Sequence, residues 1–151
     1  MKKINYLMLI LFIFVSVGCA EKQPECNDSD VKEVLFGLIR EQMQKEYEKL
    51  YFDENWNYSD LRSYARDNGI NVQNYIDEKR LELKKEAKIK VEQIVAESTI
   101  ELSGVRLTDK DEEIKKCECI SEMIIDRENS REIKYTAQYT EDDQIYVEWK
   151  Y

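Results

Sequence analysis

Hydrophobic residues recur every three or four positions from Asp30 to Phe52, the spacing of an amphipathic helix. The positions on this apolar face are Val31, Val34, Leu35, Leu38, Ile39, Met43, Tyr47 and Leu50. The polar run 27–30 supplies N-cap chemistry, and Glu33 follows Asp30 at the spacing of a capping box. The pattern therefore predicts a helix of about six turns over these residues.

Two more helices are predicted downstream. Ser59 caps the first, which spans 60–68 and ends before Gly69 at the C′ position. Asn71 caps the second, which spans 72–98. The apolar stripe of this last helix is narrow, so one of its sides should face solvent. The stripe comprises Val72, Tyr75, Ile76, Leu83, Ala87, Val91 and Ile94.

After Ser98 the period changes from helical spacing to alternation, which is typical of strands. Ile100 and Leu102 alternate with polar residues, and the alternation switches parity after Gly104, which predicts a bulge. A turn is expected at 108–112 and a second strand at 114–126. After turns at 127–130 and 141–143, the inward residues of two further strands are Ile133, Tyr135, Ala137, Tyr139, Ile145, Val147, Trp149 and Tyr151.

Helices followed by strands indicate an α+β domain, and the short turns predict a four-stranded antiparallel meander. The helices are the available cover for the apolar face of the sheet. We therefore expect the helices at 30–52 and 72–98 to pack across it. This order of elements resembles the cystatin-like or cone-like folds, in which helices precede a curved sheet.

The N-terminus has the pattern of an export signal. Lys2 and Lys3 precede an apolar run, residues 6–15, which is too short to span a bilayer and fits the hydrophobic region of a signal peptide. The run ends in Ser-Val-Gly-Cys at 16–19, which resembles the lipobox of bacterial lipoproteins, with Ser16 where that family usually has Leu. The resemblance implies a signal peptide at 1–18 and acylation of Cys19; an ordinary signal with a free Cys19 thiol is the alternative.

The resemblance also implies a location. A lipoprotein carries at least two acyl chains, which suffice for stable anchoring, so the membrane is a partner through lipid alone. The protein would then lie in the cell envelope. Ala20 after the lipidated cysteine implies the periplasmic face of the outer membrane in a Gram-negative cell. We assign residues 19–29 to the lipidated cysteine and a short tether, and 30–151 to a single domain.

The charge of the chain bears on its partners. It carries 23 basic and 32 acidic residues, a net charge of −9, and no histidine. Removal of 1–18 leaves 21 basic and 32 acidic residues, a net charge of −11. We expect no nucleic-acid binding, because phosphate contacts are made by Lys and Arg. A basic protein is the partner that this charge favours.

Three cysteines remain if Cys19 is acylated, and an oxidising compartment permits disulfides. Cys117 and Cys119 lie two apart on one face of the predicted second strand, so Cys26 could bridge to either. A thiol redox site at Cys117 and Cys119 is the alternative, although Glu112, Glu113, Glu118 and Glu122 are a poor setting for a thiolate. A metal site would need further soft ligands, of which Cys26 alone is available, and we expect none.

The part after Cys19 also resembles small secreted α+β bacterial proteins of unknown function. The residues that carry this resemblance are Cys26, Cys119, the YTAQ segment at 135–138 and the DDQIYVE segment at 142–148. It implies a Cys26–Cys119 disulfide with Cys117 left over, and it implies no activity.

No catalytic constellation and no cofactor motif occurs in the sequence, so two function classes stay open. The first is a non-enzymatic envelope lipoprotein that binds a partner, for example an acidic inhibitor or immunity protein. Its groove would be formed by Tyr51, Trp56, Tyr58 and Tyr64, because such aromatics are enriched at interfaces, although they are equally suited to core packing. The second is a thiol redox factor that uses Cys117 or Cys119.

Overall fold

The computed structural model describes residues 23–150. The predicted signal peptide, Cys19 and the inward position assigned to Tyr151 lie outside these residues. Three helices precede four strands, in the order α1 (Ser29–Asn55), α2 (Tyr58–Asp67), α3 (Val72–Glu97), β1 (Ile100–Asp111), β2 (Lys116–Ile125), β3 (Asn129–Tyr139) and β4 (Ile145–Lys150).

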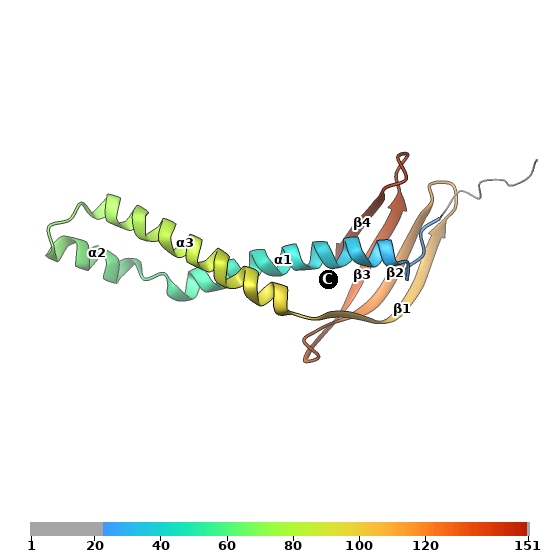
Figure 1. The fold of residues 1–151 in the computed structure, drawn as a ribbon, viewed down its shortest axis with the longest axis horizontal. Helices are drawn as coiled ribbons and strands as arrows, with labels where there is room; N and C mark the ends of the chain where they lie inside the picture. The colour runs from blue at the N-terminus through green and yellow to red at the C-terminus, as the bar shows by residue number, and fades with distance from the viewer. Residues whose placement is uncertain (1–22, 151) are drawn as a thin grey trace, which may run out of the picture.

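The strands form one antiparallel sheet in the order β1-β2-β3-β4, so the predicted α+β class with a meander sheet is confirmed. The molecule is elongated (Figure 1). The first part of α1 crosses the sheet, and the rest extends beyond it beside α3; α2 lies farther out, also beside α3, and the helices beyond the sheet form an arm. We call the sheet, together with the part of α1 that crosses it, the sheet end, and we call the helices beyond it the arm.

The helix ends agree with the predictions in part. Asn71 caps α3 by accepting a bond from the Asn74 N–H, as expected. The N-cap of α2 is Asn57 rather than Ser59, because the Asn57 side chain accepts from the Asp60 N–H. The predicted capping box of α1 is wrong: its N-cap is Asp28, whose side chain turns back to accept from the Glu25 N–H.

The left-handed turn after α2 is the one predicted. Gly69 has φ +66°, its N–H donates to the Arg66 carbonyl, and the Ile70 N–H donates to the Ala65 carbonyl. These two bonds form a Schellman motif, which favours glycine at this position because a Cβ is disfavoured there. The turn sends α3 back alongside α2.

β1 is longer than expected. The register shifts between Ser103 and Arg106, where Gly104 has φ +62°, so the predicted bulge is confirmed. The predicted turn at 108–112 is wrong, because 108–111 continue β1 past a second register shift between Leu107 and Asp109. No glycine marks that second irregularity. The turn itself lies between Asp111 and Lys116.

The main core lies between α1 and the inner face of the sheet. From α1 it takes Val31, Leu35, Ile39 and Met43, and from β2, β3 and β4 it takes Cys117, Cys119, Met123, Ile133, Tyr135, Ala137 and Val147. Pro24 and Cys26 are also buried, so folded structure begins before residue 30, inside the segment assigned to the tether.

The expected packing of α3 across the sheet is wrong. The helix packs mainly along α1, and it joins the main core only through Val91 and Val95 near its end. Ile94, predicted for its apolar stripe, is 50% exposed, whereas Val95 is buried. One helix therefore covers the sheet, and the cover ends where α1 leaves it.

Candidate functional site

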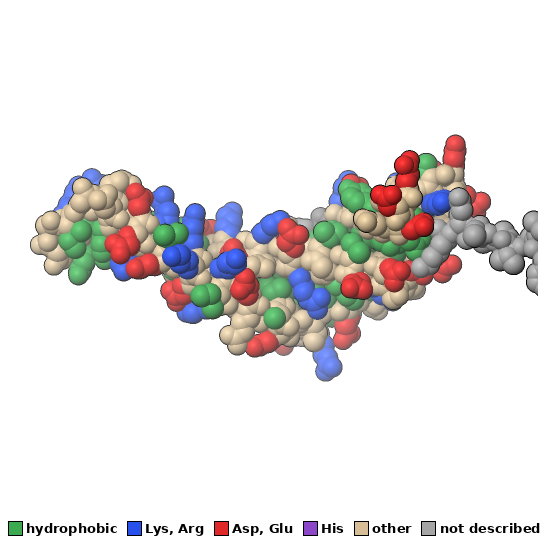
Figure 2. Space-filling view, turned by 45° about the horizontal axis from the view of Figure 1, so that its top comes forward, with side chains coloured by type: hydrophobic (Ala, Val, Ile, Leu, Met, Phe, Trp, Pro, Cys, Tyr) green, Lys and Arg blue, Asp and Glu red, His purple; other side chains and the backbone are tan. Residues whose placement is uncertain are grey.

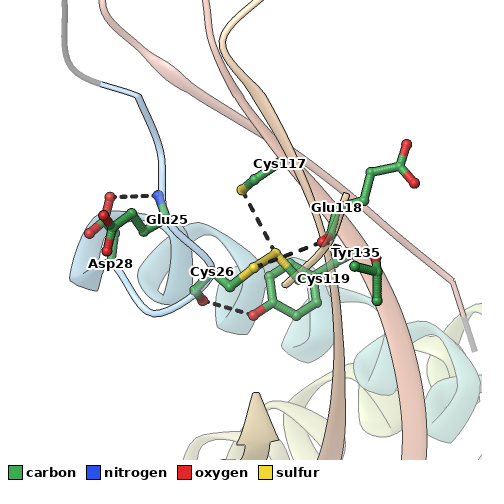
Figure 3. Close-up of a disulfide and its surroundings, with 8 residues drawn as sticks. Glu25, Cys26, Asp28, Cys117, Glu118, Cys119 and Tyr135 are labelled. Carbon is green, nitrogen blue, oxygen red and sulfur yellow. Dashed lines mark hydrogen bonds between the residues drawn. A yellow bond between two sulfur atoms is a disulfide. The ribbon is translucent and has the colours of Figure 1, made fainter. Parts of the chain in front are cut away.

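Three sulfur atoms gather where the N-terminal segment meets the sheet. Cys26 forms a disulfide with Cys119 on β2, the pairing that the family resemblance implied. Cys117 is the free cysteine, and its Sγ lies 3.7 Å from that of Cys119 (Figure 3). All three residues are buried, and the three sulfurs lie within 4.8 Å of one another. The bridge fastens the start of α1 to the second strand.

The surroundings of this cluster suit a structural link. The Tyr135 hydroxyl donates to the Cys26 carbonyl at 2.8 Å, and burial raises the Tyr135 pKa to about 12 (Figure 3). Burial also raises the pKa of the Cys117 thiol. A nucleophilic thiol has a lowered pKa and access to solvent, and Cys117 is 1% exposed. Soft-metal binding by all three sulfurs would first require reduction of the bridge, because a disulfide sulfur is not a thiolate ligand.

A cavity of about 500 Å³ opens between α1 and the sheet, beside the β2–β3 turn. Apolar side chains from three elements form its floor: Ile39, Met43, Tyr47, Met123, Ile125 and Trp149. Polar side chains line it as well: Gln42, Glu46, Glu128, Asn129, Ser130 and Arg131. The lining therefore offers apolar contact and hydrogen-bonding groups in equal number, six residues of each kind.

No residue of α3 lines this cavity, because that helix packs along α1 instead of across the sheet. The sequence does contain a signal for the floor, since Met43 and Tyr47 continue the apolar face of the first helix toward the end of the sheet. The pattern does not show whether another element covers that face or leaves it open.

The β2–β3 turn that borders the cavity is rigidly placed. Asp126 and Arg127 have φ values of 52° and 63°, and the Glu128 N–H donates to the Ile125 carbonyl, which makes a type I′ turn. The Asp126 carboxylate accepts from the Thr99 N–H at 2.7 Å. The turn is thereby tied to the junction between α3 and β1.

The four aromatic residues predicted to form a groove lie on the arm, away from the cavity. The Tyr51 hydroxyl donates to Glu86 and accepts from Lys90, both at 2.8 Å. Trp56 stacks on Phe52 at 5.3 Å between ring centroids, with Arg80 over its ring.

Tyr64 stacks on Tyr75 at 5.5 Å, and Tyr58 is 47% exposed. Three of the four residues thus join helices or stack within the arm. Whether they also form a binding groove stays a prediction.

The Tyr51 contact is part of a small charged network between α1 and α3. Lys90 forms an ion pair with Glu86 at 2.8 Å. Bonds to Glu86 and to Tyr51 raise the Lys90 pKa, and bonds from Lys90 and Tyr51 lower the Glu86 pKa. The network is exposed and joins α1 to α3. We assign it a role in orienting the two helices.

Within residues 23–150, no helix is long and apolar enough to cross a bilayer. Comparison of the chain with protein-family models, with curated proteins and with solved structures finds no match. The resemblance to cystatin-like or cone-like folds therefore stays a prediction.

Proposed function

We propose that this protein is a non-enzymatic binding protein of the cell envelope, anchored by lipid at Cys19, that holds a basic partner at its sheet end. The observation that carries the proposal is the cavity beneath α1, which has an apolar floor and a polar border. The lipobox pattern at 16–19 supports the anchor. An acidic inhibitor or immunity protein is one form of this function.

Charge complementarity favours a basic partner. Residues 100–150 carry 14 acidic and 8 basic side chains, a net charge of −6, and the cavity opens in this part of the molecule. Such a field speeds the approach of a basic protein and orients it. An apolar side chain of that partner would enter the cavity between Met43 and Met123, while its Lys and Arg residues face Glu46 and Glu128.

The test uses fluorescent peptides in which four lysines flank a central Leu-Phe pair. Two matched peptides replace the lysines by glutamates or the Leu-Phe pair by Ser-Ser. We expect the lysine peptide with Leu-Phe to bind most tightly, and its affinity to fall between about 50 mM and about 300 mM salt.

Ser130→Trp, which narrows the cavity from β3, should weaken binding of this peptide about tenfold, a loss of about 1.4 kcal/mol. Ser63→Trp on α2 is the control and should leave binding unchanged. If all three peptides bind equally, or if the two variants bind the lysine peptide equally, the proposal that the cavity holds a basic partner is refuted.

The anchor has a separate test. Expressed in a bacterium with its own N-terminus, the protein should enter the membrane fraction and take up an alkyne-labelled fatty acid, and Cys19→Ala should lose both properties. Cys117→Ala should retain them. Label on the Cys19→Ala protein would show that lipid is attached elsewhere.

A thiol redox factor that uses Cys117 or Cys119 remains the alternative proposal. The closeness of the Cys117 thiol to the disulfide is the observation in its favour. The burial of Cys117 and its raised pKa weigh against rapid exchange with another protein. Reduction of an external disulfide by the folded protein, lost in Cys117→Ala, would favour this alternative.

A further inference from the structure

A second groove, lined by lysines, runs along the arm between α1 and α3. It has a volume of about 570 Å³, and the half-buried Phe52 and the buried Ala87 lie at its floor. Five lysines line it from both helices: Lys45, Lys49, Lys84, Lys85 and Lys88. We call it the lysine groove. Figure 2 shows several Lys and Arg side chains along the arm, interspersed with Asp and Glu, and a group of Asp and Glu side chains at the sheet end.

The positive charge of the lysine groove is only partly balanced. Lys45 pairs with Glu41 at 2.7 Å and Lys88 lies 3.8 Å from Glu92. Within the described part of the chain, Lys49, Lys84 and Lys85 form no ion pair. This leaves three unbalanced lysines in a protein of net charge −9.

The spacing of these lysines opposes the stability of the helices that carry them. Lys45 and Lys49 on α1 are four residues apart, as are Lys84 and Lys88 on α3. Like charges at this spacing repel on a helix surface. Glu48, an acidic residue in the lining, accepts a hydrogen bond from Gln44 at 2.9 Å. An anionic occupant would relieve the repulsion on both walls at once.

We propose that the lysine groove binds an acidic, amphipathic helical segment of a partner protein. A groove between two helices is a common receptor for a third helix, whose apolar face lies on the floor. Phe52 and Ala87 supply that floor, and carboxylates on both sides of the bound helix would meet the lysines of α1 and α3. Leu81 is 55% exposed one turn before Lys84 and Lys85, and it extends the apolar contact along α3.

Other anionic occupants match the groove less well. A lipid bilayer would meet the ends of the lysine side chains, but its surface would not reach a floor that lies between two helices. A free phosphate would neutralise two or three lysines and leave Phe52 uncovered. A helix with acidic flanks and an apolar centre matches the walls and the floor together.

This surface is distinct from the cavity at the sheet end, and the two favour partners of opposite charge. The protein would then bind an acidic segment through its arm and a basic one through its sheet end. The inference does not depend on the proposed function, because each surface has its own peptide and its own variants.

The experiment measures binding of a fluorescent 14-residue peptide of Glu, Ala and Leu, with Leu every third or fourth position. A peptide of the same composition in scrambled order is its control. We expect the ordered peptide to bind at least tenfold more tightly than the scrambled one.

Two double variants with equal change in net charge locate the site. Lys84→Glu with Lys85→Glu should weaken binding of the ordered peptide at least tenfold. Lys134→Glu with Lys150→Glu, at paired exposed positions of β3 and β4, should change it less than twofold. All four positions are exposed, and circular dichroism checks that the fold is kept.

Three results would overturn the proposal. Equal binding of the ordered and scrambled peptides would show attraction by charge alone. Equal losses of affinity for the ordered peptide in the two double variants would show an effect of net charge rather than of the lysine groove. Binding to phosphatidylglycerol vesicles, blocked by the Lys84 and Lys85 changes, without binding of the ordered peptide would assign the surface to the membrane.

Discussion

Removing the Cys26–Cys119 bridge should strongly destabilise the protein. The two cysteines are separated by 93 residues, so the bridge closes a long loop in the unfolded chain. The chain-entropy relation gives about 4.7 kcal/mol for a loop of this length at 25 °C. With an unfolding entropy of about 2.1 cal/mol/K per residue over residues 23–150, the melting temperature should fall by about 17 °C.

The best variant for this measurement is Cys26→Ala. Removal of Cys119 instead would leave Cys26 close enough to Cys117 to form a different bridge. With Cys26 absent, Cys117 and Cys119 are two apart on one strand face, where their Cβ atoms are too far apart for an unstrained disulfide. Cys117→Ala keeps the native bridge and serves as the matched control.

Thermal unfolding followed by circular dichroism, with and without a reducing agent, tests the reasoning. Wild-type protein and Cys117→Ala should lose stability on reduction, and Cys26→Ala should not respond. If Cys26→Ala melts within about 3 °C of wild type, the bridge does not contribute through loop closure. An equal response of all three proteins to the reducing agent would refute the reasoning as well.

Three further outcomes follow from buried or constrained groups. Cys117 is 1% exposed and burial raises the pKa of its thiol. Iodoacetamide at about pH 8 should therefore label Cys117 in urea and not in the native protein. Rapid labelling of the native protein would contradict the buried position of Cys117. The Tyr135 pKa is raised from 10.0 to about 12, so the stability that its neutral phenol supplies is complete below pH 10 and lost as pH rises through 12. Tyr135→Phe should cost about 1 kcal/mol at neutral pH and reduce that alkaline loss in urea unfolding, whereas Tyr58→Phe should do neither. Asp126→Ala should lower the free energy of unfolding by about 1–2 kcal/mol, because it removes the acceptor for the Thr99 N–H and places alanine in a left-handed backbone conformation. Asp126→Asn should lower it less in the same assay. Equal losses in the two variants would contradict the turn geometry.

Local pattern was sufficient for most of the fold. The alternation from Ile133 to Tyr139 correctly predicts the buried face of β3, because a strand has only two faces and one of them is wholly apolar. Gly69 and Gly104 mark their turn and bulge because glycine favours the left-handed backbone. The run 108–111 misled the prediction, because a polar sequence in an exposed strand looks the same as a turn.

The path of α3 could not be predicted from the sequence. Its apolar stripe fits a sheet or a neighbouring helix equally well, and the choice depends on side chains that meet only after folding. Ile94 and Val95 are adjacent on α3, yet Ile94 is exposed and Val95 is buried. Rotation of the helix about its axis by one residue position would decide which of the two is buried. The lysine groove lies between α1 and α3 and so results from that choice, which the sequence pattern could not reveal.

The position of the disulfide has a mechanical consequence. The bridge joins Cys26, three residues before α1 begins, to an interior strand of the sheet. A pull on the chain from its N-terminal side would therefore pass through a covalent bond into β2 before it reached the first turn of α1. The sheet would then take up the load, and the helix above the cavity would not be unwound from its N-terminal end.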